Sequence, residues 1–303
     1  MNMRIGLPRA LLYYRYGAFW RRLLEEAGCE IITSPETTGE IIAAGLRKSV
    51  GDLCLPVKAF LGHVESLKDS VDVLFVPRYV SDEPDAYLCP KIIGLPDVVR
   101  ACFTHLPPVA SPLLHVRRDG DAALTAFCRE TSRALGLKPG LIESACRTAC
   151  AAPPAGPELP SARSAHRVRI GVIGRDYLVF DRAIGRKVLR TLDDLGATPV
   201  WLRPDEADVR EAMTVIPKWV YWSMGREVVA SAHAFFRDRG ISGVINVCSA
   251  ACGPDSFTGD LIRKRLNAGN KPYLSLSFDE HSSDVGMQTR IEAFIDMLLK
   301  VTA

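Results

Sequence analysis

Short apolar runs alternate with stretches of helical periodicity along most of the chain, and this alternation restricts the fold more than any other feature. Val71–Val76 is the clearest apolar run of the first half, closed by Pro77, and Val168–Ile173 opens the second half in the same way. Strands that alternate with helices form parallel sheets with helices on both faces. We therefore predict an α/β protein made of two tandem Rossmann-like domains, each doubly wound around a mainly parallel sheet.

The expected elements follow from apolar spacing and from glycine and proline stops. In the first half we expect strands at 3–7, 30–33, 71–76 and within 106–112, and helices at 9–27, 36–48, 122–135 and 141–150. In the second half we expect strands at 168–173, 198–202, 243–247 and 273–277, and helices at 183–195, 228–239, 256–268 and 284–299.

The stretch AAPPAGPELPSARS is the best linker in the sequence, because it is rich in Pro, Ala and Ser and has no periodicity. We predict an N-terminal domain at 1–151, a linker at 152–165 and a C-terminal domain at 166–303. Ligands of such domains lie at the carboxyl ends of the strands, and a cleft between two domains is a natural site. We expect the functional site in that cleft.

The bulk numbers exclude several classes of partner. A net charge of +3 over 303 residues gives no electrostatic reason to expect nucleic acid or an acidic membrane surface. The sequence has no signal peptide and no run of eighteen apolar residues, so we expect a cytoplasmic protein without a membrane span. Nine cysteines are many for such a chain, and a reducing compartment argues against a disulfide framework. Catalysis, metal binding and simple burial remain.

Cys54, Cys89 and Cys252 share a local context that differs from that of the other cysteines. Each lies beside proline or glycine at an expected strand or loop end, and none lies on the apolar stripe of a helix. Proline that follows closely suits a helix start, where backbone N–H groups point outward and the helix dipole is positive. Such surroundings stabilise a thiolate and an anionic iron–sulfur core.

Cations near these cysteines in sequence could add positive charge, namely Lys58, Lys91 and Arg78. The alternative is that the three cysteines are unrelated loop residues, because metal ligands are more often closely spaced. Zinc in particular usually takes close-spaced pairs and a fourth ligand. Three thiolates on a four-iron cube would leave one iron open for a substrate or a bridging ligand.

The remaining cysteines fall into weaker classes. Cys29 and Cys102 lie in apolar stretches typical of a core, and Cys128 lies in a helical pattern. Cys146 and Cys150 are four residues apart on one helix face near the linker, which we interpret as incidental. Cys248 ends a strand four residues before Cys252 and could be either a fourth ligand or a core residue.

Two further groups follow strands and could carry chemistry. Glu280 and His281 come after the strand at 273–277, where a carboxylate and an imidazole could transfer protons. The alternative there is a helix cap made by Ser282, Ser283 or Asp284. Arg175 and Tyr177 follow the strand at 168–173, and could either bind an anionic group or cluster edge or lie on the loop surface.

Several segments together resemble a known family. These are 4–14 (RIGLPRALLYY), 52–63 (DLCLPVKAFLGH), 89–91 (CPK), 174–177 (GRDY), 221–225 (YWSMG), 252–257 (CGPDSF), 279–282 (DEHS) and 289–294 (TRIEAF). They resemble the acyl-CoA dehydratase activase-related proteins, a group similar to 2-hydroxyacyl-CoA dehydratase subunits, benzoyl-CoA reductase subunits and double-cubane cluster proteins. The resemblance extends from residue 4 to about 295.

The resemblance implies Rossmann-like domains with a [4Fe–4S] cluster, or one half of a double-cubane cluster, held by Cys54, Cys89 and Cys252. It implies low-potential electrons from a separate ATP-dependent iron–sulfur activase, used for radical dehydration or reduction of an acyl-CoA or small molecule. It also implies a homodimer or a heterodimer with a related subunit. The chain has no GxxxxGK[ST] phosphate loop or other ATPase signature, so it is not the activase itself.

Three functional readings stay open from the sequence. The first is an iron–sulfur enzyme or one of its subunits, with Lys58, Lys91, Arg175 and Tyr177 around the cluster. The second is a non-catalytic electron carrier or partner subunit of a larger related protein. The third is a structural or zinc-binding protein without a cluster.

Overall fold

The computed structural model describes residues 3–151, 168–266 and 271–301. The chain divides into two compact units, Met1–Pro157 and Glu158–Ala303. The predicted linker at 152–165 lies outside the described residues.

The first unit is built on a four-stranded parallel sheet in the order β2-β1-β3-β5. Its strands are β1 (Arg4–Leu7), β2 (Glu30–Thr33), β3 (Val73–Phe75) and β5 (Val109–Ala110). A separate parallel pair joins β4 (Arg78–Ser81) to β6 (Leu113–His115). The connections leave β1 and β3 in opposite directions, so the boundary between these two strands is the topological switch point of the sheet.

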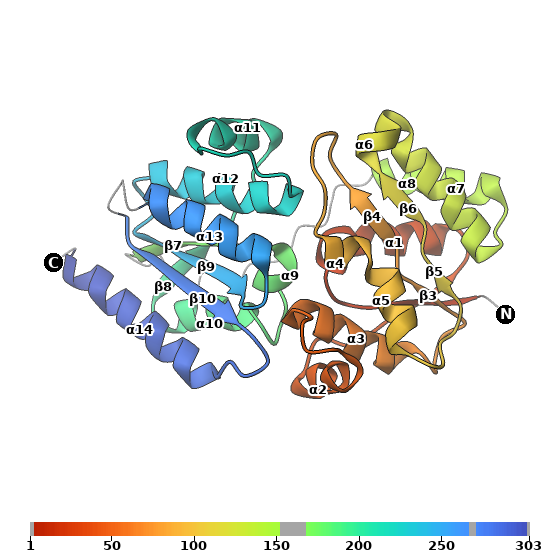
Figure 1. The fold of residues 1–303 in the computed structure, drawn as a ribbon, viewed down its shortest axis with the longest axis horizontal. Coiled ribbons are helices and arrows are strands. Elements are labelled where there is room, and N and C mark those ends of the chain that lie inside the picture. The colour runs from red at the N-terminus through yellow and green to blue at the C-terminus, as the bar shows by residue number, and fades with distance from the viewer. Residues whose placement is uncertain (1–2, 152–167, 267–270, 302–303) are drawn as a thin grey trace. The chain divides into compact units, whose positions relative to one another are not determined.

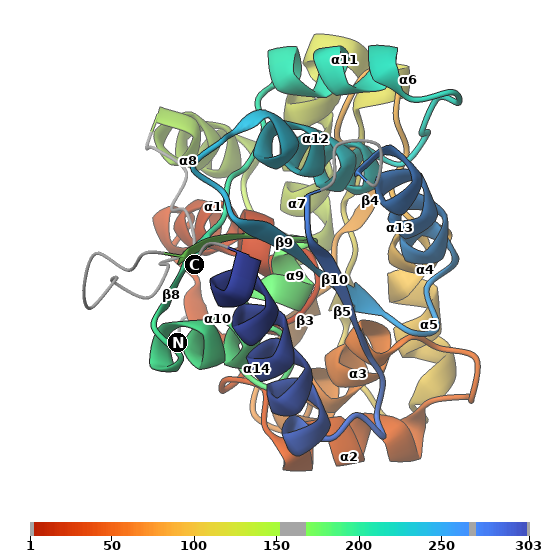
Figure 2. The same cartoon turned by 90° about the vertical axis from the view of Figure 1, so that its left-hand side faces the viewer.

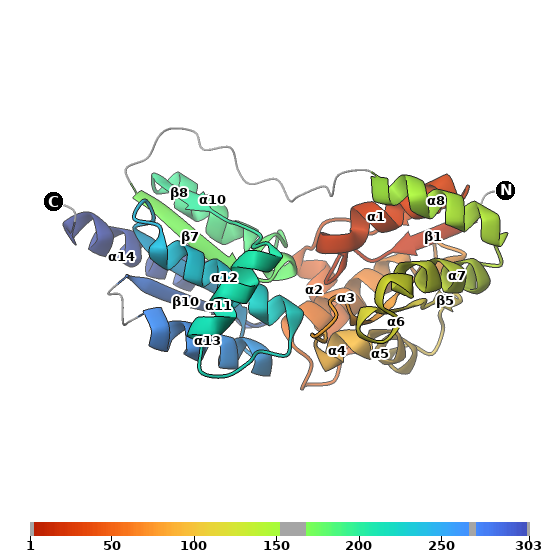
Figure 3. The ribbon, with the colours of Figure 1, turned by 90° about the horizontal axis from the view of Figure 1, so that it is seen from above.

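Helices cover both faces of this sheet. They are α1 (Tyr13–Glu26), α2 (Gly39–Lys48), α3 (Leu55–Leu67), α4 (Pro90–Ile93), α5 (Leu95–Cys102), α6 (Val116–Asp119), α7 (Ala123–Leu135) and α8 (Pro139–Ala151), with a short 3₁₀ turn at Gly120–Ala122. Helix α1 packs against α8, and α3 packs against α2 and α5. Figure 3 shows α1 and α8 on one side of β1 and α3 and α5 on the other.

An aromatic cluster fills the core of the first unit. Trp20 of α1 meets Phe75 and Tyr79 edge to face, and Phe127 of α7 meets the same two rings. The indole nitrogen of Trp20 donates a 2.9 Å hydrogen bond to the Tyr79 hydroxyl, so the buried polar atoms of both rings have a partner. These contacts tie α1 and α7 to β3 and β4.

The second unit repeats the same topology with a four-stranded parallel sheet in the order β10-β9-β7-β8. Its strands are β7 (Val168–Gly174), β8 (Ala197–Val200), β9 (Gly243–Ser249) and β10 (Tyr273–Phe278), and its helices are α9 (Asp176–Val179), α10 (Arg186–Asp194), α11 (Glu206–Val215), α12 (Ser223–Arg237), α13 (Gly253–Leu266) and α14 (Asp284–Val301). Helix α12 packs against α13, and α10 packs against α14. Figures 1 and 2 show these two helix pairs on opposite faces of the sheet.

The predicted fold class is confirmed, because both units are α/β with parallel, doubly wound sheets. The first predicted helix starts later than expected, at Tyr13, because Leu11 has a φ of 51° that an α-helix cannot contain. Helix α3 was not predicted. Its residues from Leu55 to Val64 are all buried, so the segment shows no polar face from which a helical period could be read. Among the described residues, no helix has both the length and the apolar character to cross a bilayer.

Candidate functional site

Cys54 lies directly before α3 in the first unit. Its backbone is extended, and its carbonyl oxygen accepts hydrogen bonds from the amides of Val57 and Lys58, as the first acceptor of the helix. Pro56 occupies the first turn, where a missing N–H costs nothing. The Cys54 side chain is 9 % exposed and lies at the positive end of the α3 dipole.

Cys89 has the same relation to the one-turn helix α4, in which Pro90 is the first residue. Cys89 is half-buried, and its carbonyl oxygen accepts the amide of Ile92. The ammonium group of Lys91 donates a 2.5 Å hydrogen bond to the carbonyl oxygen of Asp52. This bond ties the helix that follows Cys89 to the loop that leads into Cys54, and places the Lys91 cation between the two segments.

The cations expected around Cys54 and Cys89 differ in their burial and in their hydrogen-bond partners. Lys58 lies on α3, with only 4 % of its surface exposed. Nη2 of Arg78 donates to both carboxylate oxygens of Asp97, and Nη1 donates a hydrogen bond to the carbonyl oxygen of Ile93. Arg78 is therefore committed to holding β4 against the α4–α5 segment, whereas Lys91 faces the cysteine loops.

Cys252 lies directly before α13 in the second unit and is part of a buried polar cluster. Its side chain is 8 % exposed, and its sulfur accepts a 3.1 Å hydrogen bond from Nη1 of Arg175. The same nitrogen makes a 2.7 Å ion pair with Asp255 and a 3.3 Å hydrogen bond to the Tyr177 hydroxyl. The other carboxylate oxygen of Asp255 accepts the amide of Ser249, which closes the loop between β9 and α13.

The charges in this cluster act on one another. Burial lowers the pKa of Arg175, but Tyr177, Asp255 and Cys252 outweigh burial, so its pKa lies well above the usual value and the guanidinium stays charged. Burial raises the pKa of the Cys252 thiol, and the Arg175 charge offsets part of that rise. The sulfur is thus buried beside a permanent cation, which stabilises the thiolate form of Cys252 against the effect of burial.

The cluster lies at the topological switch point of the second sheet. Arg175 follows β7 and Cys252 follows β9, and these neighbouring strands send their connections to opposite faces. The crevice at such a point is the usual ligand site of a doubly wound sheet. The structure therefore brings together Cys252, Arg175 and Tyr177, three of the residues singled out from the sequence.

Cys248 belongs to strand β9, four residues before Cys252. Its sulfur contacts the Ser275 hydroxyl at 3.6 Å and the Leu276 carbonyl oxygen at 3.5 Å, both on the neighbouring strand β10. Burial raises the pKa of this thiol. These contacts direct the sulfur toward β10, and the role of Cys248 as a fourth ligand stays a prediction.

Glu280 and His281 lie in the turn between β10 and α14. Asp279 organises this turn, because its carboxylate accepts the amide of His281 at 3.0 Å and the hydroxyl of Ser282 at 2.8 Å. The hydroxyl of Ser283 accepts the amide of Gly286 three residues later, as an N-cap does. The predicted cap is thus present at Ser283, and the proton-transfer role of Glu280 and the exposed His281 stays a prediction.

A group of three His, Cys, Asp or Glu side chains able to hold a metal ion is absent from the described residues. The three predicted cluster ligands divide between the units, with Cys54 and Cys89 in the first and Cys252 in the second. Their assignment to one cluster stays a prediction.

Comparison with protein-family models gives two matches that together cover most of the chain. Residues 4–203 match the CoA enzyme activase uncharacterised domain (DUF2229). Residues 209–298 match the 2-hydroxyglutaryl-CoA dehydratase D-component. No curated protein matches the chain.

The chain belongs to the CoA enzyme activase uncharacterised domain family. The resemblance stated from the sequence is therefore confirmed. The activase-domain match contains Cys54, Cys89 and Arg175, whereas the dehydratase D-component match contains Cys252 and Asp255. The buried Arg175–Cys252 hydrogen bond thus joins residues from the two matched regions.

Asp255 is a residue of the site that the sequence analysis did not identify as a candidate. Its signal is its position, since an acidic residue in the first turn of α13 is favoured by the helix dipole. That signal predicts a helix start and not a partner for Arg175, which is eighty residues earlier in the chain. Only the pairing of β7 with β9 brings the two side chains together.

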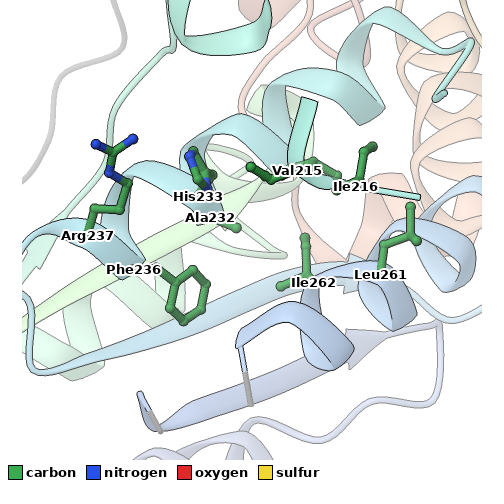
Figure 4. A pocket seen from close by; sticks show the side chains of 9 residues that line it. Val215, Ile216, Ala232, His233, Phe236, Arg237, Leu261 and Ile262 are labelled. Carbon is green, nitrogen blue, oxygen red and sulfur yellow. The ribbon is translucent and has the colours of Figure 1, made fainter. Parts of the chain in front are cut away.

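An apolar pocket of about 230 Å³ lies elsewhere in the second unit, between α11, α12 and α13 (Figure 4). It is lined by Val215, Ile216, Val229, Ala232, His233, Phe236, Arg237, Leu261 and Ile262. Two of its lining residues, His233 and Arg237, are charged or titratable, and both face Glu211, with His233 at 3.7 Å. Most of its lining residues belong to the buried hydrophobic cluster of this unit or pack against it, so the pocket is a gap in helix packing and not part of the cysteine site.

Proposed function

We propose that this member of the family binds a [4Fe–4S] cluster, or one half of a double-cubane cluster, through Cys54, Cys89 and Cys252. In this proposal it is a dehydratase-type or reductase-type component that receives low-potential electrons from a separate ATP-dependent activase. It works as a homodimer or together with a related subunit, on an acyl-CoA or another small molecule.

The observation that carries the proposal is the setting of the Cys252 sulfur. It is buried, it precedes a fourteen-residue helix, and it accepts a hydrogen bond from a buried guanidinium. Hydrogen bonds to sulfur and a nearby positive charge stabilise a reduced, anionic cluster, and they raise its potential relative to a cluster without them. A structural thiol in an apolar core needs neither.

The surroundings of Cys54 and Cys89 support their assignment as ligands together with Cys252. Cys54 and Cys89 each precede a helix that carries proline in its first turn, and Lys91 joins their two segments. Thiolate is the ligand that iron–sulfur clusters take, and none of the three candidates is in a disulfide. The residues present therefore fit the group.

Each surrounding residue has a distinct role in the proposal. A bound cluster would supply single electrons at low potential. Arg175 would donate to the sulfur of Cys252, and Asp255 would hold the guanidinium in place for that bond. Lys91 would add positive charge beside Cys54 and Cys89, with Lys58 and Tyr177 completing the surroundings. Glu280 and His281 would exchange protons with a substrate.

Iron and acid-labile sulfide analysis after anaerobic purification tests the ligand assignment. Cys54→Ala, Cys89→Ala and Cys252→Ala should each lower the iron content sharply, because each removes a ligand. Cys29→Ala is the matched control, since Cys29 is a buried cysteine of the first unit next to β2. Equal iron content in all four variants would refute the assignment of these three ligands. Zinc in place of iron in the wild type would refute the proposed iron–sulfur cluster.

Turnover with activase, ATP and a candidate acyl-CoA separates an enzyme from an electron carrier. An enzyme component consumes substrate only when activase and ATP are present. A non-catalytic carrier or partner subunit is reduced by the activase but leaves the substrate unchanged. If His281→Ala retains its cluster and full turnover, the proton-transfer role of that residue is wrong.

A further inference from the structure

Three of the remaining cysteines gather where α7 meets α8 in the first unit. Cys128 lies on α7, and Cys146 and Cys150 lie on consecutive turns of α8. The sulfur atoms of Cys128 and Cys146 are 2.6 Å apart. The spacing of Cys146 and Cys150 appeared incidental in the sequence, and the tertiary fold adds Cys128 as a third thiol.

The distance between the two sulfurs is the main observation. It lies between the length of a disulfide bond, about 2.05 Å, and ordinary van der Waals contact. The two residues are free cysteines on two packed helices, so the helix pair itself holds the thiols within bonding reach. Nothing in the candidate cluster site uses them.

Exposure rises in steps through the three thiols. Cys128 is 1 % exposed, Cys146 is 8 % exposed, and Cys150 is exposed. A reagent from solution therefore approaches this group along α8 and cannot reach Cys128 first. Cys146 lies between the two, because its sulfur touches the buried Cys128 and its residue is more exposed than Cys128.

The pKa values of the three thiols also indicate that Cys146 reacts first. The hydrogen bond from Cys128 lowers the pKa of Cys146 to about 7, and a hydrogen bond with Cys150 and the charge of Arg147 add to this effect. The same contact with Cys146 raises the pKa of Cys128, and burial raises the pKa of Cys150. Thiolate is the nucleophile in thiol–disulfide exchange, and the best attacking thiol has a pKa near the ambient pH.

We propose that Cys128 and Cys146 are a reversible dithiol–disulfide modification site that is oxidised by low-molecular-weight disulfides such as oxidised glutathione. The Cys146 thiolate attacks one sulfur of the small disulfide, which forms a mixed disulfide and releases one small thiolate. Cys128 then loses its proton and attacks the Cys146 sulfur, which releases the second small thiol. The chain loses two electrons and two protons, and the small disulfide becomes two thiols.

The bond would join α7 to α8, and α8 packs on α1. A bond between Cys128 and Cys146 would lower the conformational entropy of the unfolded chain. The oxidised form should therefore unfold at a higher temperature than the reduced form. This site is independent of the proposed cluster ligands, which are different cysteines. Its test needs no cluster and no substrate.

The experiment treats the full chain, purified anaerobically with thiols reduced, with oxidised glutathione and maps its peptides without reduction. The expected product is a peptide pair linked through Cys128 and Cys146, reversed by dithiothreitol. Its rate of formation should rise with pH up to about 7 and then level off, because the Cys146 thiolate is the attacking species.

Two variants make the assignment specific. Cys128→Ser should accumulate a glutathione adduct on Cys146 that does not resolve. Cys102→Ser, which changes another partly buried cysteine of the same unit, should behave as the wild type. The proposal is overturned if the wild type gives only adducts on Cys150, if the bond joins Cys146 to Cys150, or if Cys128→Ser leaves Cys146 unmodified.

Discussion

The ion pair between Arg175 and Asp255 is buried on both sides, and the Cys252 thiol shares the same guanidinium nitrogen. A buried pair of this kind is costly to break from one side, because the remaining charge has no solvent to stabilise it. The pair therefore matters for the stability of the second unit as well as for the sulfur.

We predict that Arg175→Met lowers the free energy of unfolding by about 3–5 kcal/mol, since it leaves the Asp255 carboxylate buried without its cation. The double variant Arg175→Met, Asp255→Asn should recover part of this loss, because the orphaned charge is gone. Urea unfolding followed by circular dichroism measures both. Equal stability of the single and double variants would show that the two charges are not coupled.

His63 of α3 is a second buried polar residue with structural consequences. It is fully buried, and its ring nitrogens contact the hydroxyls of Ser34 at 2.9 Å and Thr37 at 3.1 Å. Burial lowers its pKa to about 4, with a smaller contribution from Arg9. The folded chain therefore keeps His63 neutral, whereas the unfolded chain protonates it below a pH of about 6.5.

The sign of the resulting pH dependence follows from this difference. Between pH 6.5 and 4 the unfolded state binds the extra proton, so stability is complete above 6.5 and is lost as the pH falls toward 4. His63 should account for a loss of about 2 kcal/mol between pH 7 and 5. In His63→Gln the fall in unfolding free energy between these pH values should be smaller by that amount, as urea titrations at both pH values would show. An identical fall in both proteins would contradict the assignment.

At the scale of elements, the contact between α2 and α3 positions the start of α3 and hence Cys54. Two glycines permit this close approach. A Cβ atom at Gly45 would overlap the carbonyl oxygen of Lys58, and one at Gly62 would overlap the carbonyl oxygen of Ile41. Backbone atoms cannot move aside as a flexible side chain can, so the two helices would have to separate.

We predict that Gly62→Ala destabilises the chain by about 1–3 kcal/mol, as overpacking of a close contact does. Iron content after anaerobic purification should fall as well, because α3 carries Cys54 at its start. Gly39→Ala is the matched control, since a Cβ at the beginning of α2 meets no atom within 4 Å. Thermal unfolding and iron analysis of both variants test this, and a Gly62→Ala chain as stable as Gly39→Ala would refute it.

At the scale of the whole molecule, the proposed cluster takes ligands from both units. If cluster binding requires both units, it should stabilise both units against unfolding. This follows because a ligand that binds only the native state disfavours any unfolding that destroys its site. Loading with iron and sulfide should therefore protect amides in the first turns of α3 and α13 together.

Hydrogen exchange with mass spectrometry measures this coupling. In the wild type, loading should slow exchange at residues 55–58 and at 255–258, and removal of the cluster by a chelator should reverse both effects. In Cys252→Ala the protection at 55–58 should disappear too, although the change is in the other unit. Protection at 55–58 that survives Cys252→Ala would mean that the units do not share a cluster.

The sequence determines the strands of the two four-stranded sheets and the local setting of the cysteines. The apolar run Val168–Ile173 predicts a buried strand, because the signal lies within a few adjacent residues. Pro56, Pro90 and Pro254 likewise indicate helix starts from their immediate neighbours alone. Helix α3 escaped prediction because burial on all sides leaves no periodic pattern. The fold class was predicted correctly from such local signals, and the family from the resemblance of the quoted segments.

Only the tertiary structure decides which of these local features meet. The order of strands in a sheet depends on pairing between distant segments, so no local pattern shows that β7 lies beside β9. That pairing brings Arg175 and Asp255 to one sulfur, and the packing of α7 on α8 brings Cys128 to Cys146. Short-range periodicity specifies elements, whereas contacts across many residues exist only once the chain has packed.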